Sequence, residues 1–394
     1  MKLQAFLFLV VALPLYYHCH NTSRNSAARG EQAATEQATQ QSQTDPSIAL
    51  EADSSGNVSV GKTRAEHKNP FGVLIAKTDD QQIPPGKQVQ IAKALGANYI
   101  RARITVTDWK GSSDAYDQYA AAGFKIILNI NYDIPRDVTG DKKPIPFVTD
   151  LEAYRKTLNS ILDKYKPELA VIENEEDNPG YHSGTAQQYL TQLKTAIEVC
   201  HAHGVKVANA GLTNREIAGL VYDDLIRSGK KAEAASFAER AFPERLQSRL
   251  KQMYQPNSMV ARQLDFGRQV IEGYKTLDLD YVNFHWYEPT QSRGAGPQGI
   301  ADVQNIDPAV FETVINYVKR STGKPAITNE FGQLNRSPEI VKQLFQKVLD
   351  TGMPYAIWYS ADGGEGKAVA LQNADGTLRE NGVMFRDFIK EHCQ

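Results

Sequence analysis

The chain has 394 residues, of which 41% are hydrophobic and 23% charged, so it can bury a large core. Its 44 basic and 46 acidic side chains leave a formal net charge of −2, which gives no basic excess for neutralising a phosphate backbone. The composition therefore argues against a nucleic-acid partner and is compatible with a small uncharged ligand.

Residues 1–19 have the pattern of an export signal. Lys2 supplies a positive charge, and Leu3–Leu15 is nearly all apolar but short for a membrane span. Cys19 stands where a bacterial lipoprotein carries its lipid, whereas Ser26-Ala27-Ala28 offers an ordinary cleavage site. We expect an exported protein that is periplasmic, extracellular or an outer-membrane lipoprotein. Whether a lipid on Cys19 tethers it to a membrane stays open.

Residues 20–68 are rich in Gln, Ser, Thr, Ala and Glu and poor in bulky apolar side chains. Such a segment cannot offset the entropy of ordering by burial, so we predict a disordered tether. The folded domain is expected to occupy residues 69–394. The three cysteines are too few for a disulfide scaffold, and no metal-ligand spacing is evident, so neither a metal nor another cofactor is expected.

From Asn69 onward, short β-rich apolar runs alternate with longer stretches of helical periodicity. The runs are Phe71–Lys77, Tyr99–Val106, Lys125–Asn131, Leu169–Asn174, Lys206–Gly211, Tyr281–His285, Pro325–Asn329 and Tyr355–Tyr359. The helical stretches include Leu151–Lys166, Ala186–Ala202, Val310–Lys319 and Ile340–Asp350. Alternation of this kind predicts right-handed βαβ units and a parallel sheet, and eight such strands favour a closed (β/α)8 TIM barrel.

The rival architecture is an open doubly wound sheet. Its usual mark is a Gly-rich phosphate loop after the first strand, and Ile75-Ala76-Lys77-Thr78 stands there instead. One segment, residues 214–276 between the fifth and sixth strands, is much longer than an ordinary crossover and carries several helical patterns. We expect a helical insertion at the carboxyl end of the fifth strand, serving either as a wall of a substrate cleft or as a passive decoration.

Polar and ionisable residues gather where the predicted strands end. The fourth strand ends in Glu173-Asn174-Glu175-Glu176, the sixth in His285-Trp286-Tyr287, the seventh in Asn329-Glu330 and the eighth in Trp358-Tyr359-Ser360. The carboxyl ends of barrel strands form the rim on which active sites are built. The sequence therefore predicts an active site at this rim.

Two carboxylates stand out on the rim, Glu175 and Glu330. Hydrolysis of a glycosidic bond needs one carboxyl group to protonate the leaving oxygen and a second to attack or stabilise the anomeric carbon. The fourth and seventh strands face each other across a barrel mouth, so the pair can lie on either side of a sugar. A separation of about 5–5.5 Å would lead to retention of configuration.

These motifs resemble the clan A glycoside hydrolases, the superfamily that includes cellulases, mannanases, β-xylosidases and β-glucuronidases. In that clan the fourth strand ends in Asn-Glu and the seventh in a glutamate followed by Phe-Gly or Trp-Gly, which match Asn174-Glu175 and Glu330-Phe331-Gly332 here. The resemblance extends from about Asn69 to the end of the chain. It implies that Glu175 is the acid/base and that Glu330 is the nucleophile.

The resemblance also implies roles for residues around the pair. Asn174 would bind the sugar 2-hydroxyl, His285 and Tyr287 match a His-x-Tyr motif whose tyrosine orients the nucleophile, and Trp358 would floor the sugar subsite. An arginine of the second strand would steady the nucleophile. Arg101 and Arg103 are both candidates, and we prefer Arg103 because it lies nearer the mouth.

Alternatives remain at two positions. Glu176 stands where many clan members have proline, and Glu173 and Glu175 share a face of an ideal strand, so three glutamates compete for the acid/base role. His285 could instead be a satisfied core histidine.

We expect a retaining β-glycoside hydrolase acting on an oligo- or polysaccharide by double displacement. The alternatives are a non-catalytic carbohydrate-binding barrel lipoprotein and a metal-dependent barrel hydrolase. The latter would need several histidine or aspartate ligands at strand ends. The sequence does not identify the sugar or the oligomeric state.

Overall fold

The computed structural model describes residues 68–78, 81–132, 144–242, 244–288, 307–333, 337–363, 367–368 and 370–393. They belong to one unit, Lys62–Gln394. The predicted export signal with Cys19 and the predicted tether as far as residue 67 lie outside the described residues. Within the described part of the chain, no helix is both long and apolar enough to cross a membrane.

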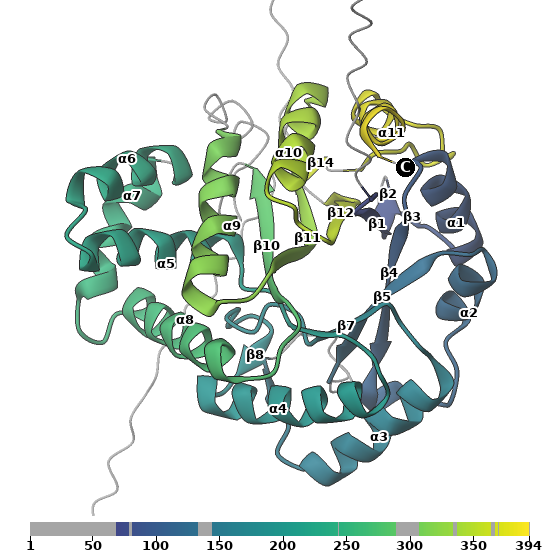
Figure 1. Ribbon diagram of the computed structural model, residues 1–394, viewed down its shortest axis with the longest axis horizontal. Coiled ribbons are helices and arrows are strands. Elements are labelled where there is room, and N and C mark those ends of the chain that lie inside the picture. The colour runs from purple at the N-terminus through teal and green to yellow at the C-terminus, as the bar shows by residue number, and fades with distance from the viewer. Residues whose placement is uncertain are drawn as a thin grey trace, which may run out of the picture. The chain divides into compact units, whose positions relative to one another are not determined.

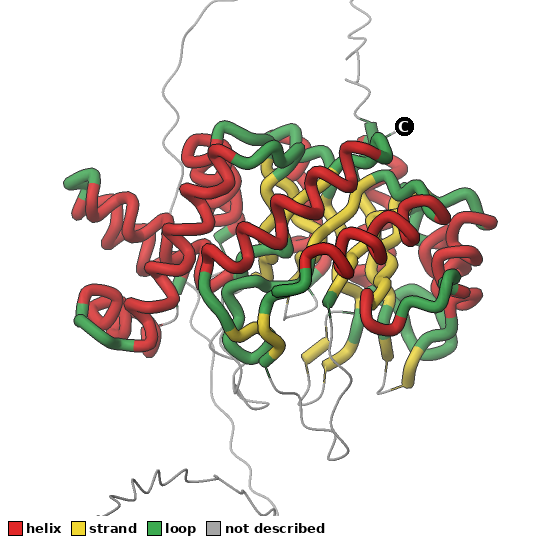
Figure 2. The backbone as a smooth tube through the Cα atoms, turned by 90° about the horizontal axis from the view of Figure 1, so that it is seen from below, coloured by secondary structure: helices red, strands yellow, loops and turns green. Residues whose placement is uncertain are grey.

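Eight parallel strands surround the centre of the domain, with helices outside them (Figures 1 and 2). They are β1 (Phe71–Ile75), β4 (Tyr99–Thr105), β5 (Lys125–Asn131), β7 (Leu169–Ile172), β9 (Val207–Asn209), β10 (Val282–Glu288), β11 (Ala326–Gln333) and β12 (Ala356–Ser360). The hydrogen-bonded order is β10-β11-β12-β1-β4-β5-β7-β9. Parallel bridges at Ala208–Tyr281 and Leu212–Phe284 connect β9 to β10 and complete the ring. The prediction of a (β/α)8 barrel is therefore confirmed.

The strands form from short apolar runs because both of their faces are covered. In β7 all four residues, Leu-Ala-Val-Ile, are fully buried, as expected for a parallel strand between a packed barrel interior and a helix layer. The predicted run was longer and ended at Asn174, whereas β7 ends at Ile172. The difference places residues 173–176 after the strand, where strand alternation no longer dictates where their side chains point.

The outer layer consists of α1 (Pro85–Ala94), α2 (Asp114–Ala121), α3 (Leu151–Lys164), α4 (Ala186–Ala202), α8 (Met259–Thr276), α9 (Pro308–Thr322), α10 (Pro338–Asp350) and α11 (Glu380–His392). Several of these helices begin with a side chain that caps the first turn. Asp150 caps α3, Ser337 caps α10, and Thr185 forms a reciprocal capping box with Gln188 in α4. Such caps satisfy backbone N–H groups that have no partner within the helix.

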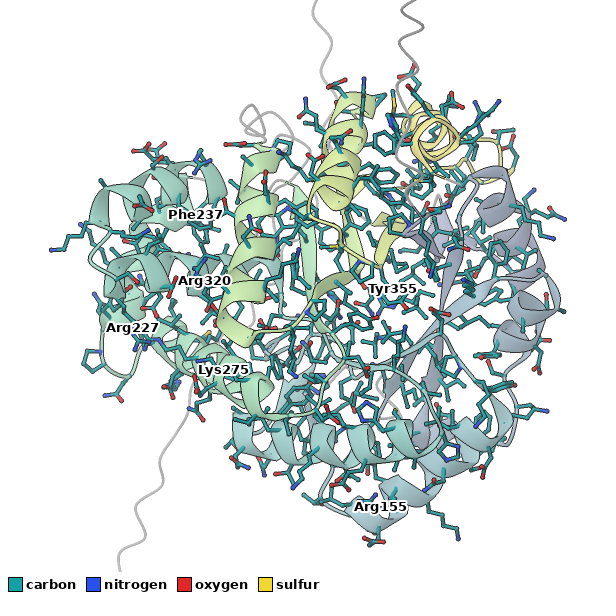
Figure 3. All side chains as sticks on the ribbon, in the orientation of Figure 1. Arg155, Arg227, Phe237, Lys275, Arg320 and Tyr355 are labelled. Atoms are coloured by element: carbon teal, nitrogen blue, oxygen red, sulfur yellow. The ribbon has the colours of Figure 1, made fainter. Side chains whose placement is uncertain are left out.

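The segment between β9 and β10 is helical, as its sequence predicted. It comprises α5 (Asn214–Arg227), α6 (Lys231–Ala241), α7 (Glu244–Leu250), the 3-10 turn η2 (Lys251–Tyr254) and α8. Helix α8 packs against α4 and α9 and so belongs to the ring around the barrel, whereas α5–α7 extend to one side of it (Figures 1 and 2). In Figure 3, Arg227 of α5 and Phe237 of α6 lie in this lateral block.

Short strand pairs and a 3-10 turn occupy the connections. The pairs are β2 (Lys77–Thr78) with β3 (Gln81–Gln82), β6 (Ile145–Pro146) with β8 (His182–Ser183), and β13 (Asp362–Gly363) with β14 (Lys367–Ala368), and the turn is η1 (Val106–Asp108). These elements were not predicted, because strands of two residues leave no periodic signal in the sequence.

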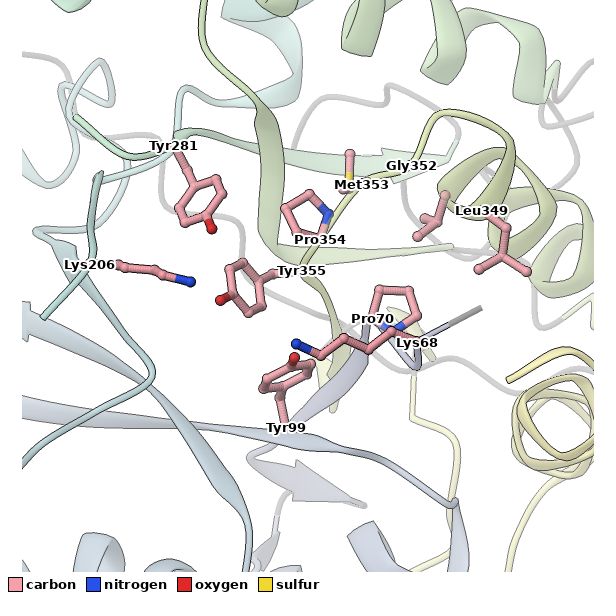
Figure 4. Close-up of a pocket in the computed structure, with 11 residues that line it drawn as sticks. Lys68, Pro70, Tyr99, Lys206, Tyr281, Leu349, Gly352, Met353, Pro354 and Tyr355 are labelled. Atoms are coloured by element: carbon pink, nitrogen blue, oxygen red, sulfur yellow. The ribbon is translucent and has the colours of Figure 1, made fainter. Parts of the chain in front are cut away.

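The amino end of the barrel is closed by aromatic side chains. Tyr355 makes edge contacts with Tyr99 and Tyr281 at centroid distances of 5.1 and 5.3 Å. Beside them lies a pocket of about 280 Å³ that Lys68 and Lys206 also line (Figure 4). All three tyrosines stand at or just before the first residue of a strand, so this pocket lies at the opposite end from the polar rim.

Candidate active site

Glu175, His285 and Glu330 meet at the carboxyl end of the barrel. They come from the loop after β7, from β10 and from β11. One carboxylate oxygen of each glutamate and one ring nitrogen of His285 all lie within 4.8 Å of one another. The two carboxylates predicted from the sequence as a pair are therefore neighbours in space. Each keeps 15% of its side-chain surface exposed, so both are accessible from the mouth.

Glu330 is surrounded by hydrogen-bond donors. The Arg101 guanidinium donates to Glu330 Oε2 at 2.5 Å, and the Tyr287 hydroxyl donates to Oε1 at 2.6 Å. Burial by itself would raise the pKa of Glu330, but the charges of His285 and Arg101 and the hydrogen bond from Tyr287 outweigh it and lower the pKa below its ordinary value. Glu330 is therefore held as an ionised carboxylate, the state a nucleophile needs.

The arginine beside Glu330 is Arg101, and our preference for Arg103 in this contact was wrong. Arg101 is 7% exposed, and it donates to the Asn129 side chain, the Asn329 carbonyl and the Asn174 side chain as well as to Glu330. Arg103 lies two residues further along β4 and is exposed. Arg103 lies nearer the mouth than the Glu330 carboxylate, which is at the level of Arg101. A sugar contact by Arg103 stays a prediction.

The backbone bends sharply between β7 and Glu175. Glu173 and Glu175 have φ values of 73° and 51°, a left-handed conformation that is uncommon for residues other than glycine. The bend breaks the alternation that would have put both side chains on one face. Glu175 Oε2 accepts a hydrogen bond from the Asn178 side chain at 2.6 Å, and its Oε1 lies 3.2 Å from His285 Nδ1. Backbone strain of this kind is often found at functional sites.

The other two glutamates of the segment point away from the mouth. Glu173 accepts hydrogen bonds from the Tyr132 backbone and from Gln192, and Glu176 accepts hydrogen bonds from Asn209 and Tyr274. Both are at least 98% buried. Burial raises the pKa of each to about 7. Neither approaches Glu330 as Glu175 does, so the geometry selects Glu175 from the three candidates as the partner of Glu330.

Asn174 is turned toward the same site. Its Oδ1 accepts a hydrogen bond from Arg101 at 2.8 Å, and since arginine only donates, that atom must be the oxygen. Its Nδ2 is the group that remains to donate to a ligand. Recognition of a sugar hydroxyl by Asn174 stays a prediction that this orientation allows.

His285 is buried yet takes part in the site. Its Nδ1 lies 3.2 Å from Glu175 and 3.9 Å from Glu330, and its Nε2 lies 2.9 Å from Asn329 Oδ1. Burial would lower the pKa of His285, but the charge of Glu330 and the hydrogen bond with Glu175 raise it above its ordinary value. His285 therefore contacts both carboxylates of the site as well as the buried Asn329, which a histidine that only fills the core would not do.

Trp358 does not face the mouth, so its prediction as the floor of the sugar subsite was wrong. Its side chain is 0% exposed and packs against Phe331 at 5.2 Å and Phe345 at 6.1 Å between ring centroids. The next residue, Tyr359, is half-buried, and its ring lies 6.1 Å from that of Tyr287. Successive residues of a strand point to opposite sides, and here the outward position holds the tryptophan.

Four asparagines lie inside the barrel, and the sequence prediction singled out only Asn329 of them, as a strand-end residue. Asn129 of β5, Asn209 of β9, Asn283 of β10 and Asn329 of β11 are all buried and are joined to one another by hydrogen bonds. The signal was present, because asparagine is rare in buried strands. Asn129, Asn209 and Asn283 lie within strands, whereas the functional residues were predicted at strand ends.

Among the described residues, Glu175, His285 and Glu330 form a group of acidic and histidine side chains close enough to surround a cation. Both Glu330 oxygens, however, already accept hydrogen bonds from Arg101 and Tyr287. Arg101 also brings a positive charge to the same carboxylate. This donor set suits a proton shared between the groups better than a metal ion.

The arrangement supports acid/base and nucleophilic chemistry. One carboxylate is held ionised by donors from two other strands, and the second contacts an imidazole that can carry a proton. An electrophilic carbon placed between them would face a nucleophile on one side and a proton donor on the other.

No protein-family model matches the chain, and no curated protein matches it significantly. Solved structures share its fold. A β-glucosidase from Pyrococcus furiosus aligns over 83% of this chain and 96% of its own, with a TM-score of 0.53 and 14% identity. A β-glycosidase from Thermosphaera aggregans aligns over 78% of this chain and 85% of its own, with a TM-score of 0.50 and 14% identity. At such identity the likeness establishes the barrel fold.

Proposed function

We propose that this protein is a retaining β-glycoside hydrolase that uses Glu330 as nucleophile and Glu175 as acid/base. The observation that carries the proposal is the approach of the two carboxylates, one oxygen of each lying within 4.8 Å of the other. Inverting enzymes leave about 6.5–9.5 Å between the carboxyl groups to admit a water molecule, whereas retaining enzymes bring them to about 5–5.5 Å. The fold shared with β-glycosidases agrees with this assignment.

In the first step a Glu330 oxygen attacks the anomeric carbon of the bound sugar. The bond from that carbon to the leaving oxygen breaks as Glu175 transfers its proton to that oxygen, and a glycosyl ester forms on Glu330. Tyr287 and Arg101 keep Glu330 ionised and aimed before the attack. The other hydrogen bonds of Arg101, to Asn129, the Asn329 carbonyl and Asn174, hold its guanidinium in place beside Glu330.

In the second step water attacks the same carbon. Glu175, now a carboxylate, removes a proton from the water, and the bond to Glu330 breaks to restore its carboxylate. Configuration is retained because the carbon is attacked twice from opposite faces. Each residue ends in the protonation state in which it began.

The proposal is tested by hydrolysis of a panel of aryl β-glycosides, β-glucosides among them. We would compare the wild type, Glu175→Ala and Glu330→Ala, each with and without azide. Both variants should lose about 10⁴-fold or more in kcat on substrates with poor leaving groups. On activated substrates azide should rescue Glu175→Ala as the β-glycosyl azide, because the small anion attacks the ester without base assistance. In Glu330→Ala azide should give the α-glycosyl azide.

Two results would contradict the proposal. Wild-type activity that survives Glu330→Ala would remove that residue from the mechanism. A wild type that binds the sugars of the panel but cleaves none of them would favour a carbohydrate-binding barrel without turnover.

A further inference from the structure

A chain of buried side-chain hydrogen bonds leads from Arg101 to His285. Arg101 Nε donates to Asn129 Oδ1 at 2.8 Å, and Asn329 Nδ2 donates to the same oxygen at 2.7 Å. Asn329 Oδ1 in turn lies 2.9 Å from His285 Nε2. The mechanism above uses Asn129 and the Asn329 carbonyl only as acceptors for Arg101 and gives no role to the Asn329 side chain.

The orientation of the Asn129 amide follows from its partners. Arginine has donors and no acceptor, so the Asn129 atom facing Arg101 must be the oxygen. The other end of the same amide faces the Glu173 carbonyl at 3.0 Å, which only accepts, and must be nitrogen. The Asn329 atom that contacts Asn129 Oδ1 is therefore a donor, and Asn329 directs its own oxygen to the opposite side.

A second set of contacts gives the same orientation for Asn329. Its backbone N–H donates to Asn283 Oδ1 at 2.9 Å, which identifies the Asn283 oxygen. Asn283 Nδ2 then donates to Asn329 Oδ1 at 2.7 Å. The Asn329 oxygen is thus fixed from two directions, by Arg101 through Asn129 and by the β11 backbone through Asn283.

This oxygen faces His285 Nε2, so Nε2 must carry a hydrogen. A neutral imidazole with a hydrogen on Nε2 has only a lone pair on Nδ1. The contact between Nδ1 and Glu175 Oε1 at 3.2 Å can then form in two ways. Either Glu175 is protonated and donates to neutral His285, or His285 is an imidazolium that donates to the Glu175 carboxylate. Both forms hold one proton beyond the one on Nε2.

We propose that Asn329 is a positioning residue that fixes the Nε2–H tautomer of His285, and that the Glu175–His285 contact thereby stores the proton that Glu175 gives to the leaving group. The inference rests on the proposed function only for the use of that proton. The opposite tautomer, with hydrogen on Nδ1, would donate to ionised Glu175 and stabilise a form of the acid that has no proton to give. Asn329 excludes this form.

The surroundings of His285 keep the ring in place. Gly211 after β9 has φ +108°, and a Cβ there would lie 2.6 Å from both Cδ2 and Nε2 of the ring. The charged groups that face the imidazole are Glu175 from the β7 loop, Glu330 of β11 and Arg101 of β4. With two acids against one guanidinium, the balance favours a proton near His285.

The tautomer can be read without an activity assay. The full chain, labelled with ¹⁵N in its eight histidines, would be studied by long-range ¹H–¹⁵N correlation spectra from pH 5 to 9, with His285→Gln used to assign the signals. We expect His285 to change from imidazolium to the neutral Nε2–H form. A neutral Nδ1–H form in the wild type would overturn the proposal.

Two substitutions at Asn329 separate positioning from a purely structural role. Asn329→Asp keeps an acceptor opposite Nε2 and should retain the Nε2–H form. Asn329→Leu removes the acceptor, so neutral His285 should populate the Nδ1–H form, and the basic limb of the kcat profile should move down by about one pH unit. At pH 7.5 kcat should fall roughly 10-fold, while KM changes less than about 3-fold.

A lowered kcat with unmoved limbs and an unchanged tautomer in Asn329→Leu would assign only a structural role to Asn329 and overturn the proposal. If that variant does not fold, the spectra of the wild type and of Asn329→Asp still decide the tautomer. Failure of the glycosidase proposal is distinguishable, because an inactive protein with an Nε2–H His285 would leave the orientation of this hydrogen-bond chain intact.

Discussion

Glu330 and Glu216 are both largely buried glutamates, but their surroundings shift their pKa values in opposite directions. Glu330 of β11 receives hydrogen bonds from Arg101 and Tyr287, and these together with the charge of His285 lower its pKa despite burial. Glu216 of α5 has an Oε1 that accepts no hydrogen bond from the described residues. Burial and the nearby charge of Asp177 raise the pKa of Glu216 to about 8.

The comparison shows that depth alone does not set the charge of a buried acid. At Glu330 the charges of His285 and Arg101 and the hydrogen bond from Tyr287 outweigh burial. At Glu216 the charges of Arg215 and Arg268 do not outweigh burial and the neighbouring acid Asp177. Hydrogen-bond donors that reach one carboxylate from separate strands stabilise its ionised form. A buried acid that lacks them is neutral at moderate pH and destabilises the fold when it ionises.

Removing Arg101 should make Glu330 resemble Glu216. In Arg101→Met the carboxylate loses its strongest donor, so kcat/KM should fall about 10³-fold, equivalent to about 4 kcal/mol. The pKa of Glu330 should rise, and since the nucleophile must be ionised, the acidic limb of the pH profile should move to higher pH. Steady-state kinetics on an activated aryl glycoside from pH 4 to 9 would measure both effects.

Arg103→Met is the matched control, because Arg103 lies on the same strand and is exposed. It should reduce kcat/KM much less and leave the acidic limb in place. A larger loss in Arg103→Met than in Arg101→Met would restore Arg103 as the residue that steadies the nucleophile.

The complementary change removes the ionisable group from α5. The unfolded chain loses the Glu216 proton near pH 4.5, whereas the folded protein keeps it until about pH 8. Stability from this group is therefore complete below pH 4.5 and is lost progressively as the pH rises to about 8. Glu216→Gln should abolish that loss, so across this window the variant should gain about 5 kcal/mol of stability relative to the wild type.

Urea unfolding at pH 5 and pH 8.5 would measure the gain. Glu239→Gln, at an exposed position of α6, controls for the loss of one carboxylate from the lateral helices. If the stability difference between Glu216→Gln and the wild type does not grow with pH, Glu216 ionises as readily in the folded protein as in the unfolded chain.

The sequence predicted the barrel because each level of pattern agreed. Eight apolar runs, the helical stretches between them and the missing phosphate loop all indicated the same topology, and strand-end chemistry identified Glu175, His285, Tyr287 and Glu330 as neighbours. Periodicity and rim position are local properties that a single chain displays. They are also the properties that long, regular segments display most clearly.

What the sequence could not predict depends on rotation and depth within the barrel. The bend at Glu173 and Glu175 puts the three glutamates of residues 173–176 into different environments. Glutamate rarely adopts a positive φ, so the sequence does not predict the bend. The choice between Arg101 and Arg103 depends on how far Glu330 reaches toward the barrel interior, which is a distance between strands rather than along one.

Trp358 and Tyr359, near the end of β12, allow a direct test of which side of this strand faces the sugar. Trp358 is fully buried against Phe331 and Phe345, while burial and the charge of Glu330 raise the pKa of its neighbour Tyr359 to about 12. Trp358→Phe should cost about 1–2 kcal/mol of unfolding free energy, part of the 3–5 kcal/mol expected for full truncation, with KM nearly unchanged.

Tyr359→Leu should instead raise KM several-fold, since a stacking or polar contact with a sugar is worth about 1 kcal/mol. Urea unfolding and KM measured on both variants would place the sugar on the Tyr359 side of the strand. A raised KM in Trp358→Phe without loss of stability would place it on the side of the tryptophan.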